Sequence, residues 1–202
     1  MDRLVYAALL AAGSSRRMGS AKALLKFGER TALERAVASI RAAGIINITI
    51  VTGIDEAAAS HACSLSVQLG NIQIVENADP DAGRTRSLQL ALASIPADAA
   101  VLLFPVDCPN VAPQTIVTMM DQRVRAEIVR PRYNGKCGHP VLFEASLRRE
   151  ILELQPDEPL RAVVHRDPKR LTDVDVTDPE VLTNLDTPQD YQNALARFAK
   201  HL

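Results

Sequence analysis

Residues 4–22 read LVYAALLAAGSSRRMGSAK, and this stretch decides the fold class. Its first part, residues 4–12, is apolar throughout, which is typical of a strand that is buried on both faces of a parallel sheet. The run is too short to cross a bilayer as a helix, and a polar segment that starts at Gly13 ends it. We therefore expect a buried first strand that leads into a polar loop, and neither a membrane span nor a signal peptide.

The remainder of the chain alternates short apolar runs with stretches of helix length, and this order predicts an α/β fold. We expect strands at 4–12, 48–52, 72–75 and 100–104, and helices at 32–43, about 55–65, 86–95 and from Pro113 onward. The pattern becomes less regular after about residue 126, where we expect strands at 127–130, 141–143 and 171–176 and a last helix at 188–199. Right-handed crossovers then give one domain over residues 1–202, with a mostly parallel central sheet between two helical layers. Ligands of such sheets bind beyond the carboxyl ends of the strands.

The composition argues against several kinds of partner. A net charge of -1 gives no general attraction to nucleic acid or to an anionic membrane. The three cysteines, Cys63, Cys108 and Cys137, lie far apart without a C-x-x-C pair, which argues against a zinc site or a disulfide framework. We expect a soluble, cytoplasmic protein that binds neither nucleic acid nor membrane.

The polar loop after the first strand has the composition of a phosphate-binding loop. Backbone N–H groups of small residues can surround an anion, and Arg16, Arg17 and Lys22 supply positive charge for a triphosphate. The spacing is neither G-x-x-x-x-G-K-[ST] nor G-x-G-x-x-G, so a nicotinamide-dependent oxidoreductase loses its main support. The alternative for this loop is a solvated basic turn without a ligand.

A carboxylate, Asp107, follows the most apolar of the expected strands in the segment FPVDCP, residues 104–109. An aspartate at this place faces the ligand crevice, and Mg²⁺ prefers one or two carboxylates together with phosphate oxygens. Asp107 is therefore the first candidate for a magnesium ligand. The alternative, a cap of the next helix, is disfavoured because Asp107 stands well before Pro113. We interpret Cys108 as a packed side chain and not as a nucleophile.

Three further segments allow two interpretations each. Asp186, in NLDTPQD (residues 184–190), is either a second metal carboxylate or part of an ordinary helix start. Arg84 and Arg86, in GRTRSL (residues 83–88), either lie on a helix surface or contact phosphate. His139, in GHPV (residues 138–141), is either structural or part of the site, since a single histidine indicates neither.

These motifs together resemble those of the molybdenum cofactor cytidylyltransferases and of the wider MobA-like NTP transferase family. LAAGSSRRMGSAK is similar to the family's L-A-A-G-x-x-x-R-M-G-x-x-K loop, and PVDCP, NLDTP and GHP match later family segments in the family's order. The resemblance implies a Rossmann-like domain of the nucleotide-diphospho-sugar transferase type, with a nucleotide-binding half at about 1–125 and an acceptor-binding half at about 126–202. It implies the following roles: nucleotide binding by Leu10, Ala11, Ala12, Gly13, Arg17, Lys22, Gly83 and Ser87, Mg²⁺ binding by Asp107 and Asp186, catalysis by Lys22, Arg17 and Asp107, and acceptor binding by His139.

The expected reaction is the transfer of CMP from CTP to the phosphate of the molybdenum cofactor, with release of pyrophosphate. The resemblance favours CTP because guanylyl-transferring relatives typically carry Gly-Gly where Ala11 and Ala12 stand. It also implies a molybdoenzyme or its chaperone as a further partner. Two alternatives remain: a cytidylyl- or uridylyltransferase that acts on another small phosphate such as a sugar phosphate, and a nucleotide-binding accessory protein for cofactor delivery that does not turn over.

Overall fold

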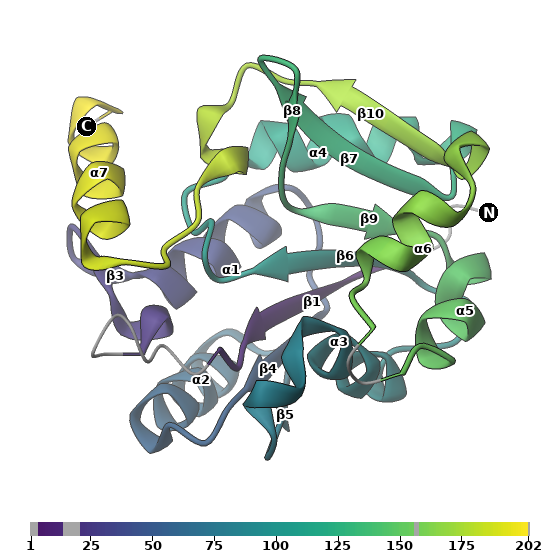
Figure 1. Ribbon diagram of the computed structural model, residues 1–202. Coiled ribbons are helices and arrows are strands. Elements are labelled where there is room, and N and C mark those ends of the chain that lie inside the picture. The colour runs from purple at the N-terminus through teal and green to yellow at the C-terminus, as the bar shows by residue number, and fades with distance from the viewer. Residues whose placement is uncertain (1–3, 14–20, 156–157, 202) are drawn as a thin grey trace.

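The computed structural model describes residues 4–13, 21–155 and 158–201, and its centre is a twisted sheet (Figure 1). The strands of this sheet are β1 (Val5–Ala11), β4 (Ile48–Thr52), β5 (Ile72–Glu76), β6 (Ala100–Pro105), β7 (Ile128–Tyr133), β8 (Lys136–Cys137), β9 (Val141–Phe143) and β10 (Leu171–Asp175). Their order is β10-β7-β9-β6-β1-β4-β5, with β8 paired to β7. A separate hairpin joins β2 (Lys26–Phe27) to β3 (Arg30–Thr31).

Side chains of the central strands alternate between two hydrophobic cores, one on each face of the sheet. Ala7 and Leu9 of β1 pack into the first core, whereas Ala8 and Leu10 pack into the second. The helices that bury residues in the first core are α1 (Ala32–Ala42), α2 (Glu56–Leu69), α4 (Pro113–Gln122) and α7 (Pro188–Phe198). Those of the second core are α3 (Gly83–Ser94), α5 (Arg148–Leu152) and α6 (Arg161–Arg166). Burial on both faces explains why β1 and β6 are apolar along their whole length.

The last helix, α7 (Pro188–Phe198), stands at one end of the molecule beside the β2–β3 hairpin (Figure 1). Aromatic contacts hold it there, because Phe27 of β2 packs edge-on against Tyr191 and Phe198, with ring centroids 5.5 and 5.9 Å away. The Arg35 guanidinium lies over the Phe198 ring. These contacts fix the segment just before α7, which carries Asp186.

The topology places a ligand crevice between β1 and β6. From β1 the chain moves through α1 to β4 on one side, and it later crosses through α3 to β6 on the other side. Both neighbours run parallel to β1, so the strand order reverses at the carboxyl ends of β1 and β6. This is the switch point at which open α/β sheets bind ligands.

The structure confirms the expected α/β fold with its mostly parallel sheet, and it adds detail that periodicity did not predict. The expected helix at 55–65 extends to Leu69, and that at 86–95 begins already at Gly83. The sheet is mixed, because β9 runs antiparallel to both β6 and β7. Within the part of the chain that the structure describes, no helix is long and apolar enough to cross a bilayer.

Candidate active site

A cavity of about 490 Å³ opens at the switch point, and most of the predicted site residues line it. Its walls comprise the end of β1 and its loop, the start of η1 (Lys22–Leu24), the turn into α3, the end of β6 and the segment before α7. The predicted residues found there are Leu10, Ala11, Ala12, Gly13, Lys22, Gly83, Ser87, Asp107 and Asp186. Arg17 lies outside the described residues, and His139 lines a neighbouring cavity.

Lys22 joins the two carboxylates that the motifs single out. Its Nζ lies 3.1 Å from Asp107 Oδ1 and 2.8 Å from Asp186 Oδ1. The side chains of Lys22 and Asp107 are only 13% and 12% exposed, so this contact is largely shielded from water, whereas Asp186 is 38% exposed. Screening is weaker for a shielded pair, so the charges of Lys22 and Asp107 act strongly on each other and on any anion that enters.

Asp107 does not cap a helix. The N-cap position of α4 is Ala112, and its backbone N–H donates to Asp178 Oδ2 at 2.8 Å, as does the Thr115 hydroxyl at 2.9 Å. The Asp107 carboxylate is thus available to face the cavity from the turn after β6. Its neighbour Cys108 is fully buried, and burial together with the Asp107 charge raises the pKa of its thiol, as expected for a packed side chain.

Asp186 does not cap a helix either. The N-cap of α7 is Thr187, which forms a capping box with Asp190: the Thr187 hydroxyl accepts from the Asp190 N–H at 3.2 Å, and Asp190 Oδ2 accepts from the Thr187 N–H at 2.8 Å. Asp186 stands one residue earlier, and its Oδ2 accepts from Asn184 Nδ2 at 2.5 Å. Its other oxygen faces Lys22, so the geometry favours the interpretation as a site residue.

The carboxylate pair fits a divalent cation that is shared with a ligand. Asp107 and Asp186 converge on one positive group, the Lys22 ammonium, and carboxylate oxygens are the donors that Mg²⁺ and Mn²⁺ prefer. Residues 4–13, 21–155 and 158–201 contain no cluster of three or more His, Cys, Asp or Glu side chains that could hold a metal. A metal at this pair would therefore complete its coordination with phosphate oxygens and water.

The turn into α3 brings backbone and hydroxyl groups to the cavity. Gly83 has φ +86°, a backbone conformation that residues other than glycine rarely adopt. Ser87, one turn into α3, accepts a hydrogen bond from the Asn77 side-chain amide at 3.0 Å. Motif reasoning missed Asn77, although it directly follows β5, at the edge of the sheet where ligand groups were expected.

Arg84 is the second residue that the motifs did not assign. Its Nη2 lies 2.7 Å from Asp107 Oδ2, so Asp107 faces one cation on each oxygen. Arg86 is exposed and lines neither cavity. The structure thus separates the two arginines: Arg84 belongs to the site, and Arg86 lies on the helix surface.

His139 lines a second cavity of about 700 Å³, which adjoins the first and shares Asp81, Gly83 and Arg84 with it. Its backbone N–H donates to the Val181 carbonyl at 2.8 Å. Burial and the nearby Arg84 charge lower the pKa of the imidazole to about 4, so it is neutral near pH 7. Its buried Nδ1 has no hydrogen-bond partner among the residues that the structure describes.

Gly138, next to His139, allows the chain to pack directly against Val181. A Cβ at this position would lie 2.1 Å from the Val181 carbonyl oxygen, so only glycine fits. The Gly138 N–H donates to the Pro131 carbonyl at 2.9 Å. Gly138 therefore anchors the segment that presents His139.

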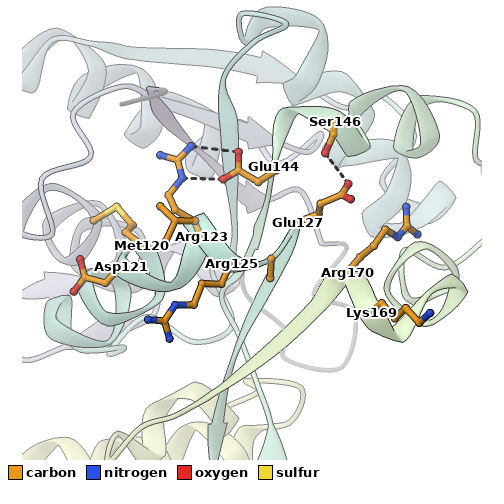
Figure 2. A pocket seen from close by; sticks show the side chains of 11 residues that line it. Met120, Asp121, Arg123, Arg125, Glu127, Glu144, Ser146, Lys169 and Arg170 are labelled. Carbon is orange, nitrogen blue, oxygen red and sulfur yellow. Dashed lines mark hydrogen bonds and ion pairs between the residues drawn. The ribbon is translucent and has the colours of Figure 1, made fainter. Parts of the chain in front are cut away.

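A larger hollow of about 720 Å³ lies at the opposite edge of the sheet, and Figure 2 shows its charged lining. It adjoins the amino ends of β7 and β10, and none of the predicted site residues line it. Within it, Arg123 pairs with Glu144, with Nε 2.8 Å from Oε1, and the neutral Ser146 hydroxyl donates to Glu127 at 2.7 Å. Most of the predicted site residues instead line the first cavity, at the switch point.

A crossover sheet with paired carboxylates and a lysine at its switch point defines the class as an α/β nucleotide-binding protein. Residues 7–172 match the MobA-like NTP transferase domain. The chain therefore belongs to the MobA-like NTP transferase family, and it is a nucleotidyltransferase-family enzyme.

Two curated relatives and a solved structure show how far the likeness extends. "Nicotine blue oxidoreductase" of Paenarthrobacter nicotinovorans is 26% identical over 91% of this chain and 92% of its own length. "Probable molybdenum cofactor guanylyltransferase" of Pelotomaculum thermopropionicum is 27% identical over 92% of this chain and 89% of its own length. The structure of Rv0371c from Mycobacterium tuberculosis H37Rv is 29% identical, covers 96% of this chain and 98% of its own, and has a TM-score of 0.79. A manganese complex of Rv0371c, 28% identical over 96% of this chain and 98% of its own, has a TM-score of 0.75 and supports a divalent metal in relatives of this chain.

Proposed function

We propose that this chain transfers CMP from CTP to the phosphate of the molybdenum cofactor and releases pyrophosphate. The observation that carries this proposal is the convergence of Asp107 and Asp186 on Lys22, at the rim of a cavity that the end of β1 and the start of α3 enclose. Carboxylates for a metal and a lysine for phosphate meet there, although their positions lie far apart in the sequence.

In the proposed reaction, an oxygen of the acceptor phosphate attacks the α-phosphorus of the nucleotide. The new bond forms between that oxygen and the α-phosphorus, the bond to the β-phosphate oxygen breaks, and pyrophosphate leaves with the electron pair. A magnesium ion held by Asp107 and Asp186 would supply positive charge beside the reacting phosphate. Lys22, with Arg17, stabilises the negative charge that moves to the leaving pyrophosphate, and the turn at Gly83 positions the nucleotide.

The choice of nucleotide rests on Ala11 and Ala12, which both line the first cavity. Each methyl group takes space that a glycine would leave open, and this favours the smaller pyrimidine base. The relative from Pelotomaculum thermopropionicum bears the name of a guanylyltransferase, so GTP is the competing donor. Membership of the family indicates a nucleoside triphosphate as donor, but it does not indicate which base the donor carries.

A screen for pyrophosphate release tests the proposal. The purified protein, with Mg²⁺, is mixed with each of the four nucleoside triphosphates and with the molybdenum cofactor or a sugar phosphate. We expect release with CTP and the molybdenum cofactor, at least ~10-fold faster than with GTP, which corresponds to about 1.4 kcal/mol. Asp107→Asn keeps the shape of the side chain and removes its charge, so it should lower the rate by ~100-fold or more.

The outcomes separate the alternatives. Faster release with GTP would contradict the proposed donor, and release with the sugar phosphate alone would contradict the proposed acceptor. Nucleotide binding without release would leave the accessory protein for cofactor delivery, acting on a molybdoenzyme or its chaperone. The relative named nicotine blue oxidoreductase makes a redox enzyme the second candidate, and oxidation of NADH or NADPH by the protein would favour it.

A further inference from the structure

Arg84 lies at the boundary between the two cavities. It is the second residue of α3, its side chain is 50% exposed, and it lines both the nucleotide cavity and the neighbouring cavity that contains His139. Lys22, in contrast, lines the first cavity and not the second. Of the two cations that contact Asp107, Arg84 thus lines both cavities and Lys22 lines the first alone.

The carboxylates of the site are held by the chain's own cations. Asp107 contacts Lys22 through Oδ1 and Arg84 through Oδ2, at 3.1 and 2.7 Å. A divalent cation bound by Asp107 would repel both groups, since like charges at such distances disfavour each other even with partial screening. Each displaced cation is then able to pair with an anion that enters the site.

Of the two cations, Arg84 is the one that can pair with an anion in the second cavity, and it also lines the first. The planar fork of a guanidinium binds two oxygens of a phosphate through two parallel hydrogen bonds, so a phosphate is a group that it recognises well. Arg84 is close enough to His139 to lower the pKa of the imidazole, and His139 offers an unpartnered, buried Nδ1 for one neutral hydrogen bond. An anionic head group that pairs with Arg84 in the second cavity would therefore lie near His139, which lines the same cavity.

One wall of the second cavity suits an apolar body, while Arg130, Glu158, Arg161 and His165 line other parts of the cavity. Leu103 of β6 and Val141 and Phe143 of β9 line it, and each of these side chains is at most 5% exposed. Val164 of α6 completes the same wall. A ligand with a phosphate at one end and a flat or apolar ring system at the other matches this combination of charge and surface.

We propose that Arg84 determines acceptor specificity: it holds Asp107 while the site is empty and binds the phosphate of an apolar-bodied acceptor in the second cavity once a metal occupies the carboxylates. This inference rests on the proposed function for the presence of metal and nucleotide. It assigns to Arg84 a role that the motifs left open, and it predicts two opposite effects of removing its charge. Metal binding should become tighter, and acceptor binding should become weaker.

The test compares the wild type, Arg84→Gln and Arg86→Gln in two binding measurements. Arg86→Gln is the matched control, because it removes the same charge from the same helix at a residue outside both cavities. The first measurement titrates each protein with Mn²⁺ alone and detects binding by electron paramagnetic resonance. The second titrates phenyl phosphate by calorimetry in the presence of Mn²⁺ and a non-hydrolysable CTP analogue, with phenol as a probe that lacks the anion.

We expect Arg84→Gln to bind Mn²⁺ at least ~3-fold more tightly than the wild type, because a competing partly shielded cation is gone. We expect it to bind phenyl phosphate at least ~10-fold more weakly, since a charge-assisted hydrogen bond is lost. Arg86→Gln should match the wild type in both measurements. The affinity for phenol, which lacks the anion, should be the same in all three proteins. These results together support the proposal.

Phenyl phosphate affinity that is equal in Arg84→Gln and Arg86→Gln, or absent in the wild type, overturns the proposal, and so does unchanged Mn²⁺ affinity in Arg84→Gln. Failure of the proposed function looks different, because the CTP analogue would then bind to none of the three proteins. The Mn²⁺ titration contains no nucleotide, so it decides the contact between Arg84 and Asp107 in either case.

Discussion

At the scale of single residues, Lys22 occupies the point where the functional groups meet. Its ammonium lies within 3.1 Å of carboxylates from two elements that are far apart in the sequence. If a metal bound those carboxylates as we propose, the long side chain of Lys22 would reach phosphate oxygens in the first cavity. In the proposed reaction, the residue that contacts both carboxylates would thus also act on the nucleotide.

Lys22→Ala should lower turnover by ~100-fold or more, because a preorganised charge that acts on the transition state is lost. Saturation kinetics with CTP and acceptor varied in turn measure this, and Lys22→Arg should restore activity only in part. Lys26→Ala is the control, since Lys26 is exposed and contacts the Glu29 carbonyl. A change confined to the Michaelis constant for CTP would make Lys22 a binding residue only.

Substitution by alanine should have different effects on stability at Gly138 and at Gly13. Gly138→Ala should lower the free energy of unfolding by ~2 kcal/mol, because the added Cβ would clash with the Val181 carbonyl. Gly13→Ala should leave stability nearly unchanged, since no described atom lies within 4 Å of its Cβ position. Gly13 lines the first cavity, where we propose that the nucleotide binds, so this variant should instead lose CTP affinity. Urea unfolding of both variants decides the matter, and equal midpoints would contradict it.

At the scale of elements, helix caps separate structural carboxylates from site carboxylates. Asp178 supplies the N-terminal acceptor of α4, and Thr187 with Asp190 caps α7. Asp107 and Asp186 take neither role, and they point to Lys22 instead. The sequence left Asp186 ambiguous because an aspartate beside Thr-Pro suits both functions.

Thr187→Ala should therefore lower the free energy of unfolding by ~1 kcal/mol through loss of the α7 cap. Asp186→Asn should change stability by less than ~0.5 kcal/mol, because its contact with Lys22 is partly exposed. It should nevertheless weaken Mn²⁺ binding, which titration of the metal measures. If Asp186→Asn destabilises the protein as much as Thr187→Ala, then Asp186 belongs to the helix start.

Sequence patterns predicted the long elements of the fold and the short strand β9, and they missed several other short elements. β1, β4 and β6 were predicted within a residue or two, because a strand buried on both faces is apolar along its whole length. The hairpin of β2 and β3 and the helices α5 and α6 are too short to show a period, and they were not predicted. The direction of β9 depends on its neighbours β6 and β7, so the sequence gives no sign of it.

At the scale of the whole molecule, the fold brings residues together that no local motif connects. Lys22 and Asp186 lie 164 positions apart, and only the placement of α7 beside the β2–β3 hairpin brings them within 2.8 Å. Asp107 was predictable because it follows a buried strand at the ligand edge of the sheet. The roles of Asn77 and Arg84 depend on which side chain each one contacts, Ser87 and Asp107 respectively, and this follows from tertiary structure alone.

The central claim is that this site transfers a nucleoside monophosphate, and isotopic labelling tests it most directly. The wild type and Asp107→Asn are each incubated with Mg²⁺, the molybdenum cofactor and CTP that carries ³²P at either the α- or the γ-phosphate. We predict that the wild type moves the α-label to the acceptor and releases the γ-label in pyrophosphate. Asp107→Asn should do so at least ~100-fold more slowly. Transfer of the γ-label to the acceptor, or no transfer of the α-label, would contradict the account.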